Sequence, residues 1–238
     1  MNKWLHRANT RLHRAKALFW STIWKFKKYK TVEDLVALHF ERWSQSDHQN
    51  RYGLFLALNS LAGEAATIIE TGTSAYGTDS SRLFDSYVRS FGGNFYTVDI
   101  NPYPSLSLRF AKSRRSHFFV MDSVQFLDNF SKITAHKSAD LIYLDSWDMD
   151  WSNPFASAEH GKKELIAIRP FLRTGTIIVV DDTPVSMKWI PFSDQDVATK
   201  FKIEYGVLPG KGAFYYQALV GIDFTIIHHD YNLVICIK

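Results

Sequence analysis

The sequence predicts an α/β fold built on a doubly wound, mostly parallel sheet of about seven strands. From residue 66 onward, short apolar runs of β-forming residues alternate with helical stretches. The chain then ends in two such runs separated only by Asp230 and Tyr231, a connection that permits nothing but an antiparallel hairpin. Polar residues also follow the strands, where ligands bind in open sheets of this class.

Five short segments, apolar on both faces, have the pattern of parallel strands buried between helices. They are residues 67–69, 95–98, 118–120, 141–144 and 176–180, and the hairpin strands follow at 224–229 and 232–237. Helices are expected between the strands at residues 80–91, 104–112, 124–130 and 156–172. Before the first strand, a capping pattern at Thr31 predicts one helix, and a second is expected over residues 52–61, ending at Gly63.

The first thirty residues differ in charge from the rest of the chain. Residues 1–30 contain nine Lys or Arg and no acidic residue, so their net charge is +9. The net charge of the whole chain is +4, so residues 31–238 have a net charge of −5. Apolar side chains at three- and four-residue spacing predict a helix over residues 3–28. We therefore expect a basic, aromatic-rich helical extension at residues 1–30 and a mildly acidic domain at residues 31–238.

Two interpretations of the extension remain open. Its basic residues, together with Trp4, Trp20 and Trp24, are typical of a helix that lies on an anionic membrane surface. Alternatively, its apolar side packs on its own domain or on a second copy in a homo-oligomer. The acidic balance of residues 31–238 argues against a nucleic-acid partner.

The location expected for the protein is cytoplasmic, with peripheral attachment to the inner face of a membrane under the first interpretation. The lone Cys236 cannot form an internal disulfide, which is compatible with a reducing compartment. No run approaches the roughly 18 apolar residues that a membrane-spanning helix needs.

The ends of the first two strands have the chemistry of a binding site. Glu70 ends the first strand and is followed by Gly72 and Ser74 in a loop that opens a helix. A pyrophosphate would favour a glycine-rich loop without an acid, whereas the cationic amino acid end of S-adenosylmethionine suits an acidic strand end. Asp99 ends the second strand, where an acid can accept hydrogen bonds from ribose hydroxyls.

The third strand ends at Asp122 and Ser123, whose side chains are expected to meet the adenine amino group. Three successive polar strand ends resemble those of class I S-adenosylmethionine-dependent methyltransferases. The resemblance implies a Rossmann-like fold, an S-adenosylmethionine cofactor and a catalytic domain at residues 31–238.

The next two strand ends resemble the metal-binding segments of cation-dependent O-methyltransferases of the catechol and antibiotic-sugar types. The first is Leu144-Asp145-Ser146-Trp147-Asp148 and the second is Val180-Asp181-Asp182. Carried over by position, Asp145, Asp181 and Asp182 would be ligands of Mg²⁺, with Mn²⁺ or Ca²⁺ as substitutes. Trp147 matches a tryptophan that lies near the adenine in the catechol enzymes.

The resemblance also implies candidates for the base that removes the acceptor's proton. The catechol enzymes have a lysine where this chain has Asp148, and some sugar enzymes use an aspartate close to the metal. His160, near the start of a predicted helix, is the second candidate. The turn Gly210-Lys211-Gly212 is too short for a phosphate loop and is interpreted as a flexible turn near the site.

Together these features predict an S-adenosylmethionine-dependent O-methyltransferase, assisted by a divalent cation, that acts on a hydroxyl of a sugar or other small polar metabolite. Two alternatives remain. One is a metal-independent methyltransferase, in which the aspartates only shape the pocket. The other is a non-catalytic, methyltransferase-like binding protein attached to a membrane by residues 1–30.

Overall fold

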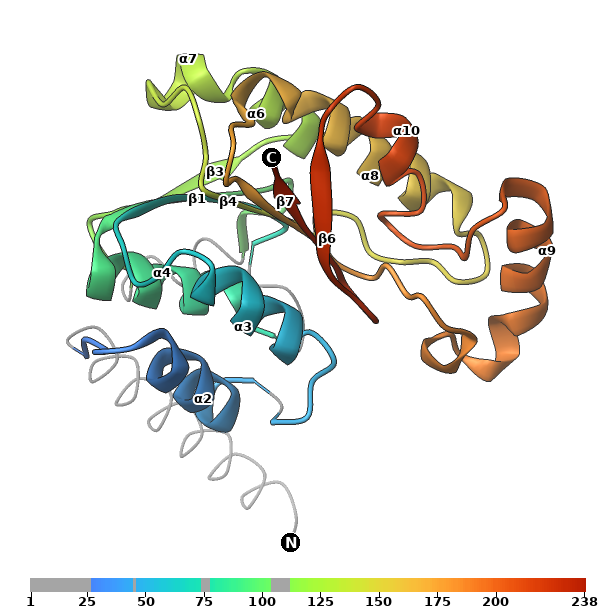
Figure 1. Ribbon diagram of the computed structural model, residues 1–238, viewed down its shortest axis with the longest axis horizontal. Coiled ribbons are helices and arrows are strands. Elements are labelled where there is room, and N and C mark those ends of the chain that lie inside the picture. The colour runs from blue at the N-terminus through green and yellow to red at the C-terminus, as the bar shows by residue number, and fades with distance from the viewer. Residues whose placement is uncertain (1–26, 45, 74–77, 104–111) are drawn as a thin grey trace, which may run out of the picture.

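A single twisted sheet organises the computed structural model, which describes residues 27–44, 46–73, 78–103 and 112–238 (Figure 1). The strand order is β3-β2-β1-β4-β5-β7-β6. The strands are β1 (Ala66–Thr71), β2 (Gly93–Asp99), β3 (Ser116–Val120), β4 (Leu141–Leu144), β5 (Ile177–Val180), β6 (Phe224–His229) and β7 (Leu233–Ile237). Strands β1 to β5 pair in parallel, and β7 runs antiparallel to both β5 and β6. The predicted fold class and the terminal hairpin are confirmed.

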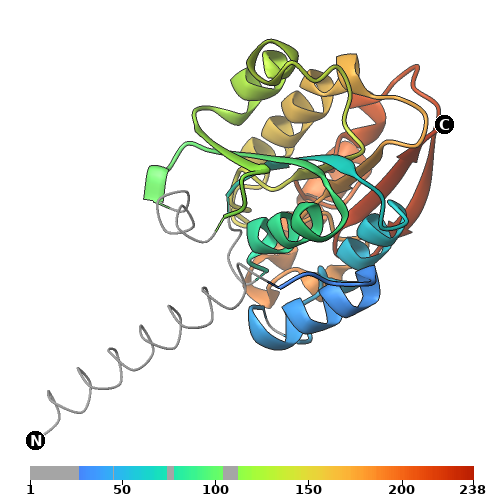
Figure 2. The same ribbon diagram turned by 90° about the vertical axis from the view of Figure 1, so that its left-hand side faces the viewer.

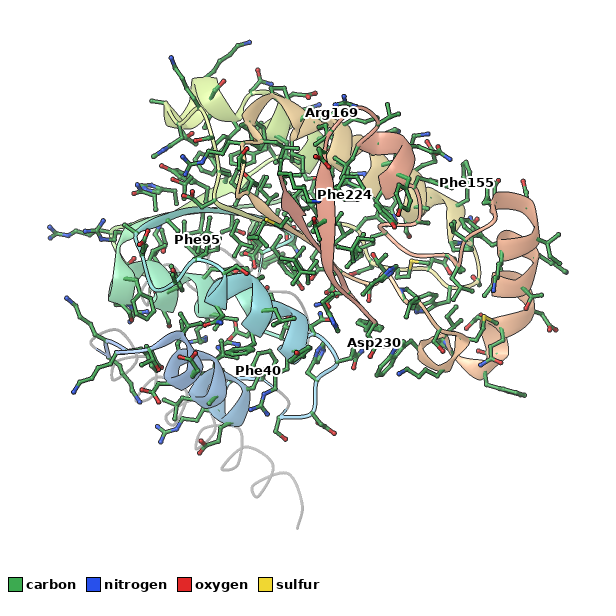
Figure 3. The ribbon with its side chains drawn as sticks, in the orientation of Figure 1. Phe40, Phe95, Phe155, Arg169, Phe224 and Asp230 are labelled. Atoms are coloured by element: carbon green, nitrogen blue, oxygen red, sulfur yellow. The ribbon has the colours of Figure 1, made fainter. Side chains whose placement is uncertain are left out.

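Helices cover both faces of this sheet (Figures 1 and 2). One face carries α2 (Val32–Arg42), α3 (Arg51–Asn59) and α4 (Ser80–Phe91). The other carries α6 (Ser123–Asp128), α7 (Phe130–Thr134), α8 (Phe155–Ala167) and α10 (Tyr215–Ala218). Successive side chains of a strand point to opposite faces, so Ile68 joins one hydrophobic cluster and Ile69 the other. Figure 3 shows Phe40 and Phe95, both members of the cluster beneath α2, α3 and α4.

Local signals in the sequence explain some of the helix boundaries. Thr31 caps α2 as predicted, because its side chain accepts a hydrogen bond of 3.1 Å from the backbone N–H of Asp34. The helix expected over residues 124–130 is split into α6 and α7. The one expected over residues 156–172 ends as α8 at Ala167 and continues as a short 3₁₀ turn that contains Pro170, whose ring cannot extend an α-helix.

The segment between β5 and β6 contains elements that the sequence analysis did not predict. These are 3₁₀ turns at Met187–Trp189 and Phe192–Asp194, the helix α9 (Gln195–Tyr205) and α10. Figure 1 shows α9 standing away from the sheet. The helices predicted over residues 3–28 and 104–112 lie almost entirely outside the described residues, and the described residues 27, 28 and 112 are not helical. Within the described part of the chain, no helix is long and apolar enough to cross a membrane.

Candidate active site

The parallel strands bring the predicted site residues to one edge of the sheet. The strand order reverses beside β1, which pairs with β2 on one side and with β4 on the other, and open sheets bind ligands at such a switch point. The ladder continues one residue beyond β4, where the Asp145 N–H donates to the carbonyl of Thr71 at 3.0 Å. Likewise the Asp181 N–H donates to the carbonyl of Leu144 at 3.1 Å. Both aspartates therefore have backbone positions fixed by the sheet.

Three carboxylates meet at this edge, in a group that we call the acidic cluster. Asp145, Asp181 and Asp182 each offer an oxygen atom, and these atoms all lie within 4.8 Å of one another. Asp182 has a φ of 41°, in the left-handed region, which costs an L-residue roughly 1 kcal/mol or more. Such strain persists where surrounding contacts hold it and is common at functional sites.

Uncharged side chains donate hydrogen bonds to the acidic cluster. Asp181 Oδ2 accepts bonds of 2.7 Å from both Asn50 Nδ2 and the Tyr143 hydroxyl. Asp182 Oδ1 accepts a bond from the Tyr231 hydroxyl. Burial, together with the neighbouring carboxylates, raises the pKa of both tyrosines, so both remain protonated donors at neutral pH.

A lysine completes the cluster. Lys211 Nζ forms ion pairs with Asp145 Oδ1 and, at 2.9 Å, with Asp182 Oδ2. The lysine residue is only 4% exposed. Burial alone would lower its pKa, but attraction to the carboxylates of Asp145, Asp182 and Asp181 outweighs burial and holds the pKa well above its usual value. Lys211 is therefore a buried cation held by the carboxylates around it.

Two of the carboxylates, Asp145 and Asp181, have a raised pKa and are harder to ionise than free ones. Burial is the main reason that the pKa of Asp181 is raised, and the charge of Asp182 adds to the effect. Burial also raises the pKa of Asp145, although the Lys211 ammonium opposes the change. When all three carboxylates are ionised, the single Lys211 ammonium does not balance them, and the cluster then attracts further positive charge.

The donor set fits a hard divalent cation. Mg²⁺ prefers carboxylate oxygens and keeps several of its waters, and three such oxygens lie close enough to share one ion. Asp145, Asp181 and Asp182 would hold it, as the sequence predicts. Lys211 and the hydroxyl donors occupy several of the same oxygens in the structure described here.

Glu70 lies at the end of β1, one strand away from the acidic cluster. Its side chain is fully buried and accepts hydrogen bonds from the hydroxyls of Ser81 and, at 2.6 Å, Thr97 through Oε2. Its other oxygen, Oε1, is buried and makes no hydrogen bond within the described residues, although the Ser80 hydroxyl is close enough to lower the pKa of the carboxyl group. Burial raises the pKa of Glu70 to about 7, against the opposing effect of neighbouring hydroxyls. An unused buried acceptor of this kind fits the ammonium group of an amino acid ligand.

The other predicted cofactor contacts, Asp99 and Asp122, accept hydrogen bonds from backbone N–H groups at the same edge of the sheet. Asp99 accepts hydrogen bonds from the N–H groups of Thr73, at 3.0 Å, and Asn101, at 2.7 Å. Asp122 is the N-cap of α6 and accepts a bond of 2.9 Å from the Gln125 N–H. A carboxylate has about four acceptor sites, so these bonds leave capacity for a ligand hydroxyl or amine.

Gly72 has a structural reason to be glycine. Its φ is 83°, and a Cβ atom at this position would lie 2.2 Å from the backbone oxygen of Asp145. Glycine thus allows the loop after β1 to pass against the end of β4. Ser74, the remaining predicted residue of this loop, lies outside the described residues.

A network of polar side chains lies near the ends of the strands that carry the predicted cofactor contacts. The Ser123 hydroxyl donates a hydrogen bond of 3.1 Å to the Ser146 hydroxyl. His160 Nε2 lies 3.0 Å from Ser123 Oγ and 2.9 Å from Ser146 Oγ. Ser146 also donates to Glu164 at 2.8 Å. The Trp147 ring stacks at a tilt on His160, with centroids 5.0 Å apart, and remains half-exposed.

The two candidate bases differ in their surroundings. The contacts of His160 are with the serine network and Trp147, and none of them is with the three aspartates. Asp148 is exposed, and its backbone carbonyl accepts a 3.2 Å bond from Ser157. The assignment of either residue as a base stays a prediction.

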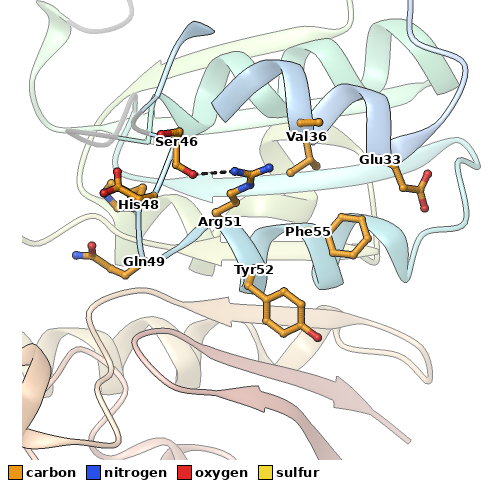
Figure 4. A pocket seen from close by; sticks show the side chains of 10 residues that line it. Glu33, Val36, Ser46, His48, Gln49, Arg51, Tyr52 and Phe55 are labelled. Atoms are coloured by element: carbon orange, nitrogen blue, oxygen red, sulfur yellow. Dashed lines mark hydrogen bonds between the residues drawn. The ribbon is translucent and has the colours of Figure 1, made fainter. Parts of the chain in front are cut away.

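Two cavities border the acidic cluster without including the three aspartates. One, of about 500 Å³, lies between α2, α3 and the loop that joins them; its lining includes His48, Tyr52 and Phe55 (Figure 4). The loop reaches the acidic cluster through the hydrogen bond from Asn50 to Asp181. Burial lowers the pKa of His48 in this loop, although Asp181 and Asp182 oppose the change. The other, of about 230 Å³, is lined by residues that include Thr183, Gly212, Tyr215 and His229.

The sequence analysis missed the partners of the acidic cluster. The Gly210-Lys211-Gly212 turn was placed near the site, and the structure confirms this position but shows a buried lysine that contacts two of the aspartates. Tyr143 lies in β4, two residues before Asp145, and its side chain therefore points to the same face, a spacing that could have indicated the contact. Asn50 and Tyr231 come from distant segments and gave no signal.

The strand order and the antiparallel β7 define the class I S-adenosylmethionine-dependent methyltransferase fold, and the site lies at the edge where that fold binds ligands. Solved structures similar to this chain include MycE, a methyltransferase from the mycinamycin biosynthetic pathway, in complex with Mg and SAH. Its TM-score is 0.57 at 16% identity, over 89% of this chain and 55% of MycE. The chain thus spans about half the length of MycE.

A second similar structure is the apo form of CalS11, TDP-rhamnose 3′-O-methyltransferase, an enzyme in calicheamicin biosynthesis. Its TM-score is 0.53 at 14% identity, over 93% of each chain. At these identities the likeness shows the fold. No protein-family model and no curated protein sequence matches the chain.

Proposed function

We propose that this protein is an S-adenosylmethionine-dependent O-methyltransferase that acts on a hydroxyl of a sugar or other small polar metabolite, assisted by a divalent cation. The observation that carries the proposal is the acidic cluster, which lies at the carboxyl edge of the sheet beside the Glu70 and Asp99 strand ends. The likeness to MycE with Mg and SAH, and to the sugar-modifying CalS11, supports it at the level of the fold.

The chain's own residues would have separate tasks. When bound, the cofactor supplies an electrophilic methyl group and the divalent ion supplies positive charge beside the acceptor oxygen. Glu70 would bind the amino group of the cofactor through Oε1, and Asp99 would accept bonds from the ribose hydroxyls. Asp145, Asp181 and Asp182 would hold the ion, and Asp148 or His160 would take the acceptor's proton. Rate enhancement would come mainly from positioning and from stabilising negative charge on the acceptor.

A metal-independent methyltransferase is the second candidate, and Lys211 favours it. Its ammonium already lies between Asp145 and Asp182, where it could stabilise a developing oxyanion without a metal.

Calorimetry and turnover assays separate these candidates. We expect S-adenosylmethionine to bind, and S-adenosylhomocysteine to form when sugar-like hydroxyl acceptors are supplied with Mg²⁺. A chelator should abolish turnover, and Mg²⁺ or Mn²⁺ should restore it.

Variants of the acidic cluster provide the sharper comparison. Asp181→Asn should reduce turnover more than cofactor affinity, because the ion contacts the acceptor and not the donor. Asp150→Asn, at an exposed aspartate, is the matched control. Turnover that survives a chelator would establish the metal-independent candidate instead. Cofactor binding with no turnover on any acceptor would favour a binding protein, and a failure to bind the cofactor would refute both enzyme candidates.

A further inference from the structure

The backbone around Lys211 is fixed against the end of β5. The Lys211 N–H donates to the carbonyl of Asp182 at 3.0 Å, and the Gly212 N–H donates to Thr183 Oγ1 at 2.9 Å. A Cβ atom on Gly210 would lie 2.5 Å from the backbone oxygen of Asp182, and one on Gly212 would lie 2.7 Å from Thr183 Oγ1. The two glycines therefore let the turn lie directly on the segment that carries the acidic cluster.

The opposite side of the turn is equally close to α8. A Cβ atom on Gly161 would lie 2.0 Å from the carbonyl oxygen of Lys211, so this helix position must also be glycine for the turn to fit. Lys211 is thus held between a helix and the end of a strand. Its placement is a built feature of the fold, unlike that of a surface lysine that swings into an acidic patch.

The side chain uses this placement to contact two of the three carboxylates. Lys211 Nζ pairs with Asp145 Oδ1 and Asp182 Oδ2, and the side chains of the pairs are 5%, 7% and 19% exposed for Lys211, Asp145 and Asp182, respectively. Ion pairs shielded from water in this way are screened little by salt. A divalent ion that binds the cluster needs the same oxygens, and its charge repels an ammonium close by.

We propose that Lys211 is a built-in cation that competes with divalent ions for the acidic cluster, so that a metal binds all three carboxylates only when the lysine ammonium leaves Asp145 and Asp182. Lys211 thereby sets the metal affinity of the site. The proposal rests on the metal site of the proposed function, but it concerns ion binding alone and needs neither cofactor nor acceptor.

The test is metal binding measured without cofactor or acceptor. Calorimetric titration with Mn²⁺ and Mg²⁺ should show that Lys211→Met binds metal more tightly than the unmodified protein, by roughly ten- to a hundredfold, the equivalent of one charged hydrogen bond. Lys211→Arg keeps the positive charge and should bind metal as weakly as the unmodified protein. Lys162→Met is the matched control, because Lys162 also pairs with a carboxylate, Glu159, on the surface of α8.

Folding is measured in parallel, because Lys211→Met leaves three buried carboxylates without their cation. We expect its melting temperature to be lowered in a chelator and restored by Mg²⁺, with a larger rise than the unmodified protein shows. A melting temperature that stays low in Mg²⁺ would show that no ion replaces the lysine and would overturn the proposal.

The outcomes also separate this proposal from the proposed function. Equal metal affinity in Lys211→Met and in the unmodified protein would refute the competition while leaving a metal-assisted enzyme in place. Metal binding by none of the variants would refute the competition and the metal site together, while cofactor binding would remain to test the methyltransferase itself.

Discussion

Glu70 gives the protein a dependence of stability on pH that one substitution should remove. Burial raises its folded-state pKa to about 7 from the ordinary value of 4.5. The carboxyl group therefore stays protonated in the folded protein over a range of pH in which the unfolded chain has lost that proton. Its contribution to stability is fully present below about pH 4.5 and is lost as the pH rises through about 7. The difference of about 2.5 in pKa corresponds to about 3 kcal/mol.

Glu70→Gln replaces the carboxyl group with a neutral amide of similar shape that can still accept a hydrogen bond from Thr97. Urea unfolding of both proteins at pH 5 and pH 8 measures the effect. The free energy of unfolding of the unmodified protein, relative to that of Glu70→Gln, should fall by about 2–3 kcal/mol between the two pH values. Glu64→Gln is the control, because Glu64 is exposed and should leave the dependence unchanged.

A difference between the two proteins that stays constant from pH 5 to pH 8 would refute the burial argument for Glu70. A difference of the opposite sign would mean that the folded state stabilises the ionised carboxylate, so that the hydroxyls of Ser81 and Thr97 outweigh burial.

Three further predictions concern the cofactor loop and the extension. Asp99→Ala should weaken S-adenosylmethionine binding by about 1–3 kcal/mol in calorimetry; unchanged affinity in a folded variant would remove the ribose assignment. Gly72→Ala should lower the free energy of unfolding, measured in urea, by roughly 2–4 kcal/mol, because backbone strain at positive φ adds to a clash with Asp145. Gly175→Ala is the control: its φ is 87°, but a Cβ atom there meets no other atom, so it should cost only about 1 kcal/mol. Deleting residues 1–26, which keeps the buried core residue Tyr29 in place, should leave the domain folded and, if the extension lies on a membrane, abolish salt-sensitive binding to anionic vesicles. Salt-insensitive behaviour with loss of solubility would indicate packing on protein instead.

The sequence was sufficient to bring Asp145 and Asp181 together. Each directly follows a short apolar run, and the two runs become β4 and β5, which pair in parallel with Leu144 opposite Val180. Parallel strands end at the same edge of the sheet, so residues in equivalent positions after paired strands must be neighbours. The same reasoning placed Glu70 and Asp99 at one edge of the sheet; β1 and β2 pair in parallel with Glu70 opposite Thr97, two residues before Asp99.

The remaining parts of the site come from segments whose positions no periodicity encodes. Asn50, which donates to Asp181, lies in the loop between α2 and α3 and is 131 residues away from it in the chain. Lys211 lies in the long connection between β5 and β6, which includes α9 and α10, neither of which the pattern of apolar residues predicted. Where such a segment returns to the sheet depends on packing with α8, so only the folded structure reveals the contact.

These later contacts change what the strand-end aspartates imply. Three carboxylates this close would repel one another, and a divalent ion is one way to hold them together in the ionised form. The protein itself supplies an ammonium from Lys211 and hydroxyl donors from Tyr143 and Tyr231, which reduce the repulsion without any ion. The aspartates at the strand ends therefore determine where a cation would bind. Whether it binds depends on how much of their negative charge Lys211 already neutralises. Because one ammonium leaves the cluster with an excess of negative charge, metal affinity measured with and without the Lys211 charge is the quantity that distinguishes a metal-assisted enzyme from a metal-independent one.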